Sequence, residues 1–283
     1  MHPVLFKIGT IPVYSFGLMM GLGFIAASWI LTKDLVRKGY DQNLGSTITL
    51  LAILFGLAGS KILFLLENLN DFLEHPSMMI SPGGLTWYGG FILATAAIWQ
   101  YAKKKKIPFL RIADATAPAL MLGYGIARIG CHLSGDGDYG YPTTLPWAAV
   151  YSNGTYPPSL AFRDFPDIVS KYGVNGVVPD TIPVHPTPVY EFIAGMILFG
   201  ILWGMRKKFT VDGQLFSIYL VMAGMARFLV EFIRLNPRVA IGLSEAQLIS
   251  IILIITGIIG LFLKRPMISQ VWAPAAPIDR WNG

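Results

Sequence analysis

The sequence is poor in charge and almost without cysteine. Only 13% of its 283 residues are charged, about half the share that is usual in soluble proteins. A soluble fold of this length would need more charge to cover its surface, and here 54% of the residues are hydrophobic, with a mean hydropathy of +0.56. The single Cys131 excludes an intrachain disulfide and a zinc site built from cysteines. The composition therefore predicts a protein that lies mostly in a lipid bilayer, and it excludes a disordered, fibrous or disulfide-stapled chain.

Seven apolar stretches are long enough to cross a bilayer, whose hydrocarbon layer of about 30 Å requires roughly 20 helical residues. Because backbone polar groups cannot be left unpaired in lipid, each stretch is expected to be a helix. They cover residues 12–31, 45–67, 85–102, 112–132, 188–205, 214–233 and 244–263. We therefore predict an all-α integral membrane protein, a seven-helix transmembrane bundle. Residues 1–132 would hold helices one to four, residues 133–187 a small extracytoplasmic head rich in Gly, Pro and Tyr, and residues 188–283 the last three helices and a tail.

The basic residues predict the orientation of this bundle. If the N-terminus is outside, fourteen Lys and Arg residues fall in the inner loops and the C-terminal tail, and five fall outside. The positive-inside rule then places the N-terminus and the head outside the membrane and the C-terminus in the cytoplasm. The net charge of +6 is thus mostly a mark of topology, and no nucleic-acid partner is expected.

Three basic residues, Lys61, Arg128 and Arg227, remain inside the predicted spans. A cation in the middle of a membrane helix costs at least about 2.5 to 3.5 kcal/mol, so such residues usually have a function. Counting at 1.5 Å per residue, all three lie roughly 6–9 Å below the outer surface. Three cations at one depth predict a pocket for an anion, and the phosphate of a phospholipid headgroup fits the paired donors of arginine.

Each of these cations also has a purely structural interpretation. Lys61 could extend its amine to the interface, and Arg227 could simply pair with Glu231 and Arg234, which follow it at intervals of four and seven residues. Arg128 has no carboxylate near it on its own helix, because Asp114 lies fourteen residues earlier, near the inner surface. Arg128 is therefore the strongest functional candidate.

Other polar residues are expected at the same depth. Tyr88 stands among paired glycines near the outer end of the third span, and Glu191 lies just inside the fifth, which His185 precedes. The loop after Arg128 contains Asp136 and Asp138, but it lacks the closing Glu of a calcium loop and the Lys-Ser/Thr ending of a phosphate-binding loop. No metal site and no cofactor are predicted.

Several segments of the chain resemble the prolipoprotein diacylglyceryl transferase family. They are Phe16-Gly17-Leu18-Met19, then Gly83-Gly84-Leu85-Thr86-Trp87-Tyr88-Gly89-Gly90, then Asp114 through Arg128 and Gly130 to the loop Gly135–Gly140, and finally the pair His185-Pro186-Thr187-Pro188-Val189-Tyr190-Glu191 and Arg227-Phe228-Leu229-Val230-Glu231-Phe232-Ile233-Arg234. The last two motifs are specific when they occur together.

The resemblance implies a bacterial inner-membrane enzyme that moves the diacylglyceryl group of phosphatidylglycerol to the lipobox cysteine of a preprolipoprotein, forming a thioether and releasing glycerol phosphate without a metal. Membrane lipids and the signal peptides of preprolipoproteins are the implied partners. It implies catalytic roles for Arg128, Arg227, Tyr88, Glu231 and His185, with Glu231 orienting Arg227. It implies substrate-binding roles for Lys61, Gly89, Gly130, Asp136, Gly140, Glu191, Arg234 and Asp114, although Asp114 could be structural.

The chain departs from the family pattern at several positions. Tyr88 stands where the family often has a histidine, Cys131-His132 where it commonly has Asn-Phe, and Phe16, Lys61 and Ala223 replace a tyrosine, an arginine and a tyrosine. An unperturbed tyrosine is a poor base because its pKa is near 10. The group that deprotonates the thiol therefore stays open among Tyr88, His185 and His132. The alternatives in function are an inactive relative or a transport-type protein that binds phospholipid; a metal-dependent phosphotransferase would need more aspartates.

Overall fold

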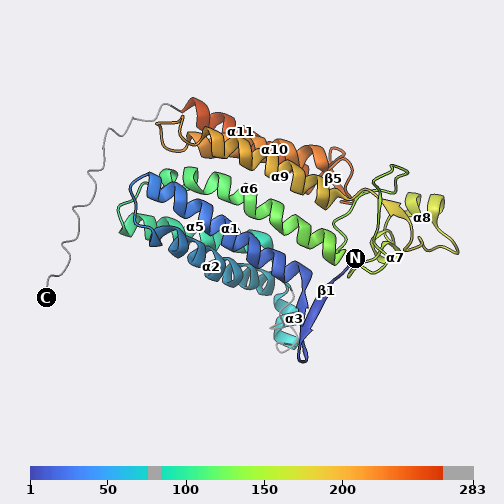
Figure 1. The fold of residues 1–283 in the computed structure, drawn as a ribbon. Helices are drawn as coiled ribbons and strands as arrows, with labels where there is room; N and C mark the ends of the chain where they lie inside the picture. The colour runs from blue at the N-terminus through green and yellow to red at the C-terminus, as the bar shows by residue number, and fades with distance from the viewer. Residues whose placement is uncertain (76–83, 264–283) are drawn as a thin grey trace. The chain divides into compact units, whose positions relative to one another are not determined.

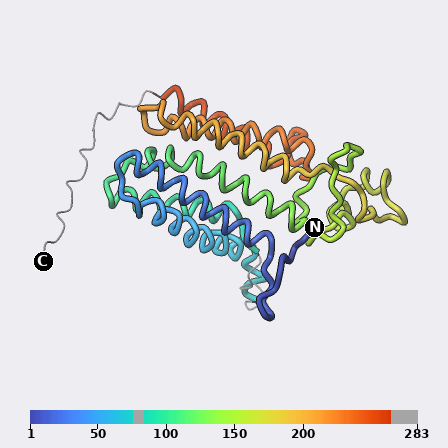
Figure 2. Tube along the Cα trace, viewed as in Figure 1, coloured from blue at the N-terminus to red at the C-terminus, as the bar shows by residue number. Residues whose placement is uncertain are grey.

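The structure is a computed structural model that describes residues 1–75 and 84–263, and it is mostly helical (Figures 1 and 2). Gly83 of the glycine motif and the basic tail residues Lys264, Arg265 and Arg280 lie outside the described residues. The chain divides into two compact units, which are described separately. The first consists of Met1–Ala27, Ala113–Phe209 and Gly213–Leu263, and the second of Ser28–Ile112 and Thr210–Asp212. The long helices α1 (Ser15–Arg37) and α6 (Phe109–Ser134) each run from one unit into the other.

Apolar helices form the frame of the first unit. Besides its parts of α1 and α6, it contains α9 (Thr187–Met205), α10 (Gln214–Val230) and α11 (Glu245–Phe262). Helices α10 and α11 pack closely because Gly224 and Gly257 leave room for the facing helix, and a Cβ at Gly224 would lie 2.9 Å from the carbonyl oxygen of Ser250. Short strands β5 (Arg238–Ala240) and β6 (Leu243–Ser244) pair between these two helices.

The segment 135–186, which joins α6 to α9, has a small hydrophobic core of its own. It contains β3 (Ala149–Val150) paired antiparallel with β4 (Pro183–Val184), and the short helices α7 (Pro158–Ala161) and α8 (Pro166–Tyr172). Its core is formed by Tyr139, Tyr151, Phe162, Ile168, Val178 and Val184. We call this segment the insert.

The second unit contains α2 (Asn43–Glu67), the short α3 (Leu69–Glu74) and α5 (Trp87–Lys104). Helices α2 and α5 approach each other backbone to backbone at Gly59 and Gly89, where a Cβ on Gly89 would collide with the Gly59 carbonyl oxygen. Arg111 forms a bidentate ion pair with Asp212, in which Nε and Nη2 each lie 2.9 Å from a carboxylate oxygen.

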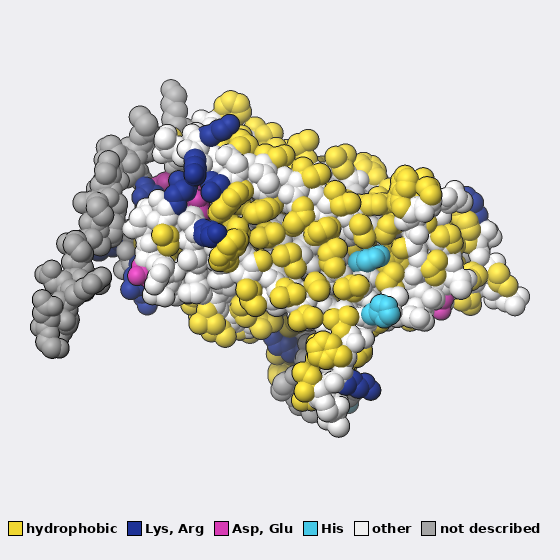
Figure 3. Space-filling view, viewed as in Figure 1, with side chains coloured by type: hydrophobic (Ala, Val, Ile, Leu, Met, Phe, Trp, Pro, Cys, Tyr) yellow, Lys and Arg dark blue, Asp and Glu magenta, His cyan; other side chains and the backbone are white. Residues whose placement is uncertain are grey.

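Within the described residues, a helix of at least 17 residues occupies each of the seven predicted stretches. By length and apolarity, α1, α2, α9 and α11 qualify as membrane spans, and α10 is a shorter apolar helix. Large apolar side chains such as Leu50, Ile197 and Ile252 point outward, and Figure 3 shows hydrophobic side chains covering much of the visible surface. The prediction of a mostly helical membrane protein is therefore confirmed.

Several predicted boundaries are wrong: α1 continues to Arg37 where an end at residue 31 was expected, and α6 begins at Phe109 where a start at residue 112 was expected. The first stretch was expected to be helical from residue 12, but β1 (Val4–Ile8) and β2 (Ile11–Tyr14) form an antiparallel hairpin and the helix begins at Ser15. The sixth was expected to reach residue 233, but α10 ends at Val230, because the chain turns there toward Asn236 and Pro237. This early end frees the chain around Arg234 to form a bridge with Gly140 of the insert.

Candidate functional site

Six charged side chains gather in the first unit where α6 ends and α9 begins. α6 brings Arg128, α9 brings Glu191, α10 and the turn after it bring the other two arginines and a second glutamate, and the insert brings an aspartate. The members of this charged cluster are Arg128, Arg227, Arg234, Asp138, Glu191 and Glu231. Three positive charges face three negative ones, so the cluster is neutral as a whole.

Glu191 is the centre of the charged cluster. Its Oε1 accepts hydrogen bonds from Nη1 of Arg227 at 3.1 Å and from the Tyr124 hydroxyl at 2.5 Å. Its Oε2 accepts from Nη1 of Arg234 at 2.9 Å and lies 3.5 Å from Nε of Arg128. Only 3% of this residue is exposed, and a carboxylate buried so deeply is tolerated only when it is paired. Glu191 therefore fixes three guanidinium groups around one point.

Glu231 supports two of the same arginines from the other side. It is fully buried, with Oε2 3.0 Å from Nη2 of Arg227 and 3.8 Å from Nε of Arg234. Its Oε1 accepts from Asn236 at 2.5 Å and from Ser244 at 2.8 Å. Ser244 is also the N-cap of α11, where it forms a capping box with Gln247, so the position of Glu231 is tied to the start of that helix.

Asp138 connects the insert to the arginines. One of its oxygens pairs with Arg128 and the other accepts from Nη2 of Arg234 at 2.5 Å. Burial opposes ionisation of this carboxyl, but the positive charges of Arg234 and Arg128 outweigh it and hold the pKa of Asp138 below its usual range. The pKa of neighbouring Asp136 moves upward, because it is partly buried and lies close to the negative charge of Asp138. Asp138 thus stays ionised and holds the insert against the helices.

The arginines retain donors for a further anion. Among the described residues, Nη2 of Arg128 and Nε of Arg227 donate no hydrogen bond, and the side chains of these two arginines are 18% and 27% exposed. Arg234, at 8%, is more deeply buried. Because arginine binds phosphate through parallel N–H donors, these two partly exposed guanidinium groups can receive a phosphate while the carboxylates hold them in place.

The fit to a metal ion is poor in the described part of the chain. Cys131, Asp136 and Asp138 place one potential ligand atom each within 4.8 Å of one another. Both oxygens of Asp138, however, already pair with Arg128 and Arg234, whose charges oppose a bound cation.

The sequence profile described as prolipoprotein diacylglyceryl transferase matches residues 3–263 of the chain. The chain belongs to this family. A phosphatidylglycerol--prolipoprotein diacylglyceryl transferase of Clostridium tetani is 32% identical over 261 residues, which is 91% of this chain and 96% of that protein. One of Dehalococcoides mccartyi is 33% identical over 257 residues, 89% of each chain. A protein of Clostridium perfringens named phosphatidylglycerol--prolipoprotein diacylglyceryl transferase 2 is 30% identical over 262 residues, 92% of this chain and 94% of that one.

The structure brings together five of the residues that the sequence indicated for a diacylglyceryl transferase. Arg128, Arg227, Glu231, Glu191 and Arg234 all belong to the charged cluster. The two arginines expected to grip a phosphate converge on one glutamate, as a shared site requires. Arg128 was expected to have no carboxylate nearby on its own helix, and its two partners indeed come from other elements, the insert and α9.

Two predicted glycines have clear packing roles. A Cβ on Gly130 would lie 3.0 Å from Cβ of Met19 and 3.2 Å from Cα of Phe16, so this glycine lets α6 and α1 approach closely. A Cβ on Gly140 would collide with the carbonyl oxygen of Ile233, next to the backbone bridge between Gly140 and Arg234. Gly140 therefore allows the insert to reach the charged cluster.

Asp114 lies at the opposite end of α6 from Arg128. Its two oxygens accept hydrogen bonds from the backbone N–H groups of Gly213 and Phe216, at 2.7 and 2.8 Å. Gly213 is the N-cap of α10 and has no side chain to cap the helix, so Asp114 supplies the missing acceptors. These contacts give Asp114 a structural role that reaches across helices, from α6 to the start of α10.

Lys61 and Tyr88 belong to the second unit. The amine of Lys61, on α2, lies 4.9 Å from the centre of the Phe64 ring, and Tyr88, 39% exposed in the first turn of α5, contacts the Trp87 ring edge to face. Gly89, beside Tyr88, is the close-approach glycine between α2 and α5. Their predicted roles toward the substrate stay predictions.

Sequence reasoning missed two members of this site. Tyr124, one turn before Arg128, donates to Glu191 while its ring lies 4.9 Å from the guanidinium carbon of Arg128. In the sequence, Asp138 is only one of two carboxylates in the loop after Arg128, and the family resemblance gives the substrate-binding role to Asp136 instead. Charge balance could have indicated Asp138, because three buried arginines with only two helical glutamates require a third carboxylate.

Proposed function

We propose that this chain transfers the diacylglyceryl group of phosphatidylglycerol to the cysteine thiol of a prolipoprotein, the first step of lipoprotein maturation. The observation that carries the proposal is the convergence of Arg128 and Arg227 on Glu191, with donors left over for a phosphate, in a chain of the diacylglyceryl transferase family. The names of the relatives supply the two substrates. The acceptor would be the lipobox cysteine of a signal peptide.

The chemistry requires positive charge at the phosphate. The thiolate attacks the glycerol carbon, the C–O bond to the phosphate breaks, and negative charge gathers on the departing glycerol phosphate. Fixed cations stabilise that charge and thereby lower the barrier. Arg128 and Arg227 would contact the phosphate, while Glu191, Glu231 and the other members of the charged cluster would hold their guanidinium planes in position.

The remaining predicted residues are assigned to the substrates on the resemblance. It gives a substrate-binding role to Lys61 and Gly89 of the second unit and, separately, to Asp136, Gly130 and Gly140 of the first. Tyr88, His185 and His132 are the candidates for the base that deprotonates the thiol.

We also propose the topology that the charge distribution favours. All seven long helices would span the bacterial inner membrane, with the N-terminus and the insert on the outer side and the C-terminus in the cytoplasm. The charged cluster adjoins the insert, so phosphatidylglycerol of the outer leaflet would reach it.

The test is direct transfer to a peptide. Purified protein in phosphatidylglycerol proteoliposomes is mixed with a lipobox peptide, and intact-mass spectrometry follows the peptide. We expect a mass increase of one diacylglyceryl group with wild type, and a rate about 100- to 1000-fold lower with Arg128→Ala, since one positioned donor is worth that much in comparable sites. Arg163→Ala is the matched control, because this arginine of the insert has a side chain that is 69% exposed.

A wild-type protein that binds phosphatidylglycerol and leaves the peptide mass unchanged would contradict transfer and support a lipid-binding or transport protein. Equal rates for wild type and Arg128→Ala would remove the charged cluster from the reaction.

A further inference from the structure

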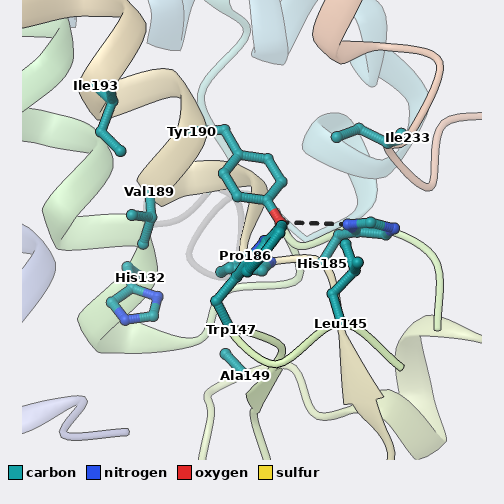
Figure 4. Close-up of a pocket in the computed structure, with 10 residues that line it drawn as sticks. All are labelled: His132, Leu145, Trp147, Ala149, His185, Pro186, Val189, Tyr190, Ile193 and Ile233. Carbon is teal, nitrogen blue, oxygen red and sulfur yellow. Dashed lines mark hydrogen bonds between the residues drawn. The ribbon is translucent and has the colours of Figure 1, made fainter. Parts of the chain in front are cut away.

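A cavity of about 840 Å³ lies where the end of α6, the insert and the start of α9 meet (Figure 4). Among the described residues that line it there is no Asp, Glu, Lys or Arg. Most of the lining is apolar, and Leu145, Trp147, Val189 and Ile193 are among its members. The lining side chains of a type that titrates near neutral pH are His132 and His185. The apolar lining therefore suits an uncharged group such as a thiol, and a histidine of the lining could accept the proton of that group.

The hydrogen bonds of His185 make it a donor toward the cavity. The Tyr190 hydroxyl oxygen accepts from Nε1–H of Trp147 at 2.8 Å, since an indole can only donate. The Tyr190 hydroxyl hydrogen is then available to Nδ1 of His185, at 3.3 Å (Figure 4). With Nδ1 accepting, a neutral His185 carries its proton on Nε2. Burial lowers the pKa of His185, which favours this neutral form.

His132, the second histidine of the cavity, also contacts a tyrosine hydroxyl through Nδ1. Its Nδ1 lies 2.8 Å from the hydroxyl of Tyr151, which is fully buried and stacked on Tyr139 in the core of the insert. Burial raises the pKa of Tyr151, so it remains a hydroxyl. The contact fits either tautomer of the imidazole, and in the tautomer whose Nδ1–H donates to the Tyr151 oxygen, Nε2 of His132 holds a lone pair.

His132 is also well placed along its helix. It follows Arg128 by four residues on the same face of α6, about 6 Å further along the axis. A donor lipid whose phosphate contacts Arg128 would thus have its reacting carbon within a short distance of the cavity. Asp138, a carboxylate of the charged cluster, is less suited to act as the base because it is already paired with two arginines.

We propose that His132 is the base of this enzyme and that the cavity receives the thiol-bearing segment of the acceptor. The inference rests on the proposed function. Nε2 takes the thiol proton while Nδ1 donates to Tyr151, the thiolate forms the C–S bond as the C–O bond to the phosphate breaks, and the imidazolium returns the proton to the glycerol phosphate or to water. One proton moves and no redox partner is needed.

The experiment is a pH profile of single-turnover transfer, measured by peptide mass from pH 5.5 to 9 in proteoliposomes saturated with phosphatidylglycerol. The variant is His132→Asn, whose amide can keep the bond to Tyr151 but has no group at the position of Nε2. We expect a rate at pH 7 about 100-fold or more below wild type, as for loss of a general base. The deficit should shrink as the pH approaches the thiol pKa of about 8.5, where the thiolate forms without help. His75→Asn is the matched control, because His75 is an exposed histidine after α3 that does not line the cavity, and it should keep the wild-type shape of the profile.

A second acceptor separates catalysis from structure. A lipobox peptide with selenocysteine in place of cysteine is ionised at pH 7, so His132→Asn should use it within about tenfold of the wild-type rate. His132→Gln, which keeps a polar group near Nε2 without its basicity, should behave as His132→Asn does. Thermal unfolding in detergent checks that each variant is folded.

An unchanged rate and pH profile in His132→Asn, with wild type active, would overturn the assignment of His132 and leave the proposed function standing. An equal loss with the thiol and selenol peptides would also overturn it, because His132 would then act only by shaping the site. A wild type that transfers nothing to either peptide would overturn the proposed function itself.

Discussion

The two ends of α6 both bury charge, and they do so in opposite ways. At one end Asp114 is surrounded by backbone N–H groups of α10, which are neutral, fixed in direction and fully used. At the other end Arg128 faces carboxylates from α9 and the insert, and part of its guanidinium remains exposed. The first arrangement is complete without a ligand, whereas the second has matched charges and still has donors for an anion.

We propose that the difference separates a structural charge, Asp114, from a functional one, Arg128. A carboxylate that caps a helix stabilises the fold and gains nothing from a substrate. A cluster of three arginines and three carboxylates is an expensive way to stabilise a protein, because buried ion pairs often contribute little compared with apolar residues of the same size. Its presence beside an open cavity is better explained by a reaction that needs positive charge.

Among substitutions of the residues that hold the arginines in place, the largest effect is expected from Glu191→Gln. The substitution keeps the shape of the side chain but removes the charge that three arginines share, so the cluster gains a net positive charge and the guanidinium groups lose their common anchor. Breaking such a buried pair costs about 3 to 5 kcal/mol, and we expect transfer to fall about 100-fold or more. Peptide mass spectrometry measures the rate.

Glu245→Gln is the control for this substitution, since Glu245 is an exposed carboxylate in the first turn of α11. If Glu191→Gln transferred as fast as Glu245→Gln, the arginines would not need their shared anchor, and the contrast between the two ends of α6 would be lost.

Asp114→Ala should have a smaller effect, and on a different quantity. It leaves two N–H groups at the start of α10 without acceptors, which should lower the free energy of unfolding by about 2 kcal/mol. Transfer per folded molecule should stay close to wild type, because the substitution lies at the far end of α6 from Arg128. Thermal unfolding in detergent and the transfer rate are measured on the same samples.

Asp180→Ala is a useful comparison, because within the described residues Asp180 accepts one backbone hydrogen bond, from Ser159 at 2.8 Å. We expect a smaller loss of stability from it. A large loss of transfer in folded Asp114→Ala would give Asp114 the substrate role that the family resemblance implied.

The positions of the long helices could be predicted from apolar length alone, because the bilayer fixes how many residues a span needs. The start of α1 and the end of α10 could not, since apolar residues such as Ile11 and Val13 pair in a strand as readily as they continue a helix. A separate segment at residues 133–187 could be predicted, but its internal fold could not. Its core depends on side chains as distant in sequence as Tyr139 and Val178, and no periodic pattern in the sequence indicates that these side chains are buried together.

At the charged cluster, the sequence indicated the residues whose burial is costly and missed those that become important only by proximity. Arg128, Arg227 and Glu191 can be recognised in the sequence because a charged side chain inside an apolar stretch costs free energy and is rarely kept without a function. Tyr124 does not, because a tyrosine in a membrane helix is ordinary. Its contact with Glu191 joins positions 67 residues apart, which only the fold brings together.

Tyr124→Phe should give the smallest effect and tests how finely the cluster is positioned. The ring that lies against Arg128 is kept, while the hydroxyl that donates to Glu191 at 2.5 Å is lost. A hydrogen bond to a charged group contributes about 1.5 to 3 kcal/mol, but Glu191 keeps its three arginines, so we expect only a five- to tenfold fall in transfer. Tyr219→Phe removes a hydroxyl from the same apolar cluster without touching Glu191, and it should transfer like wild type. Equal rates for the two variants would mean that the arginines alone hold Glu191, and the functional end of α6 would then begin at Arg128 rather than one turn earlier.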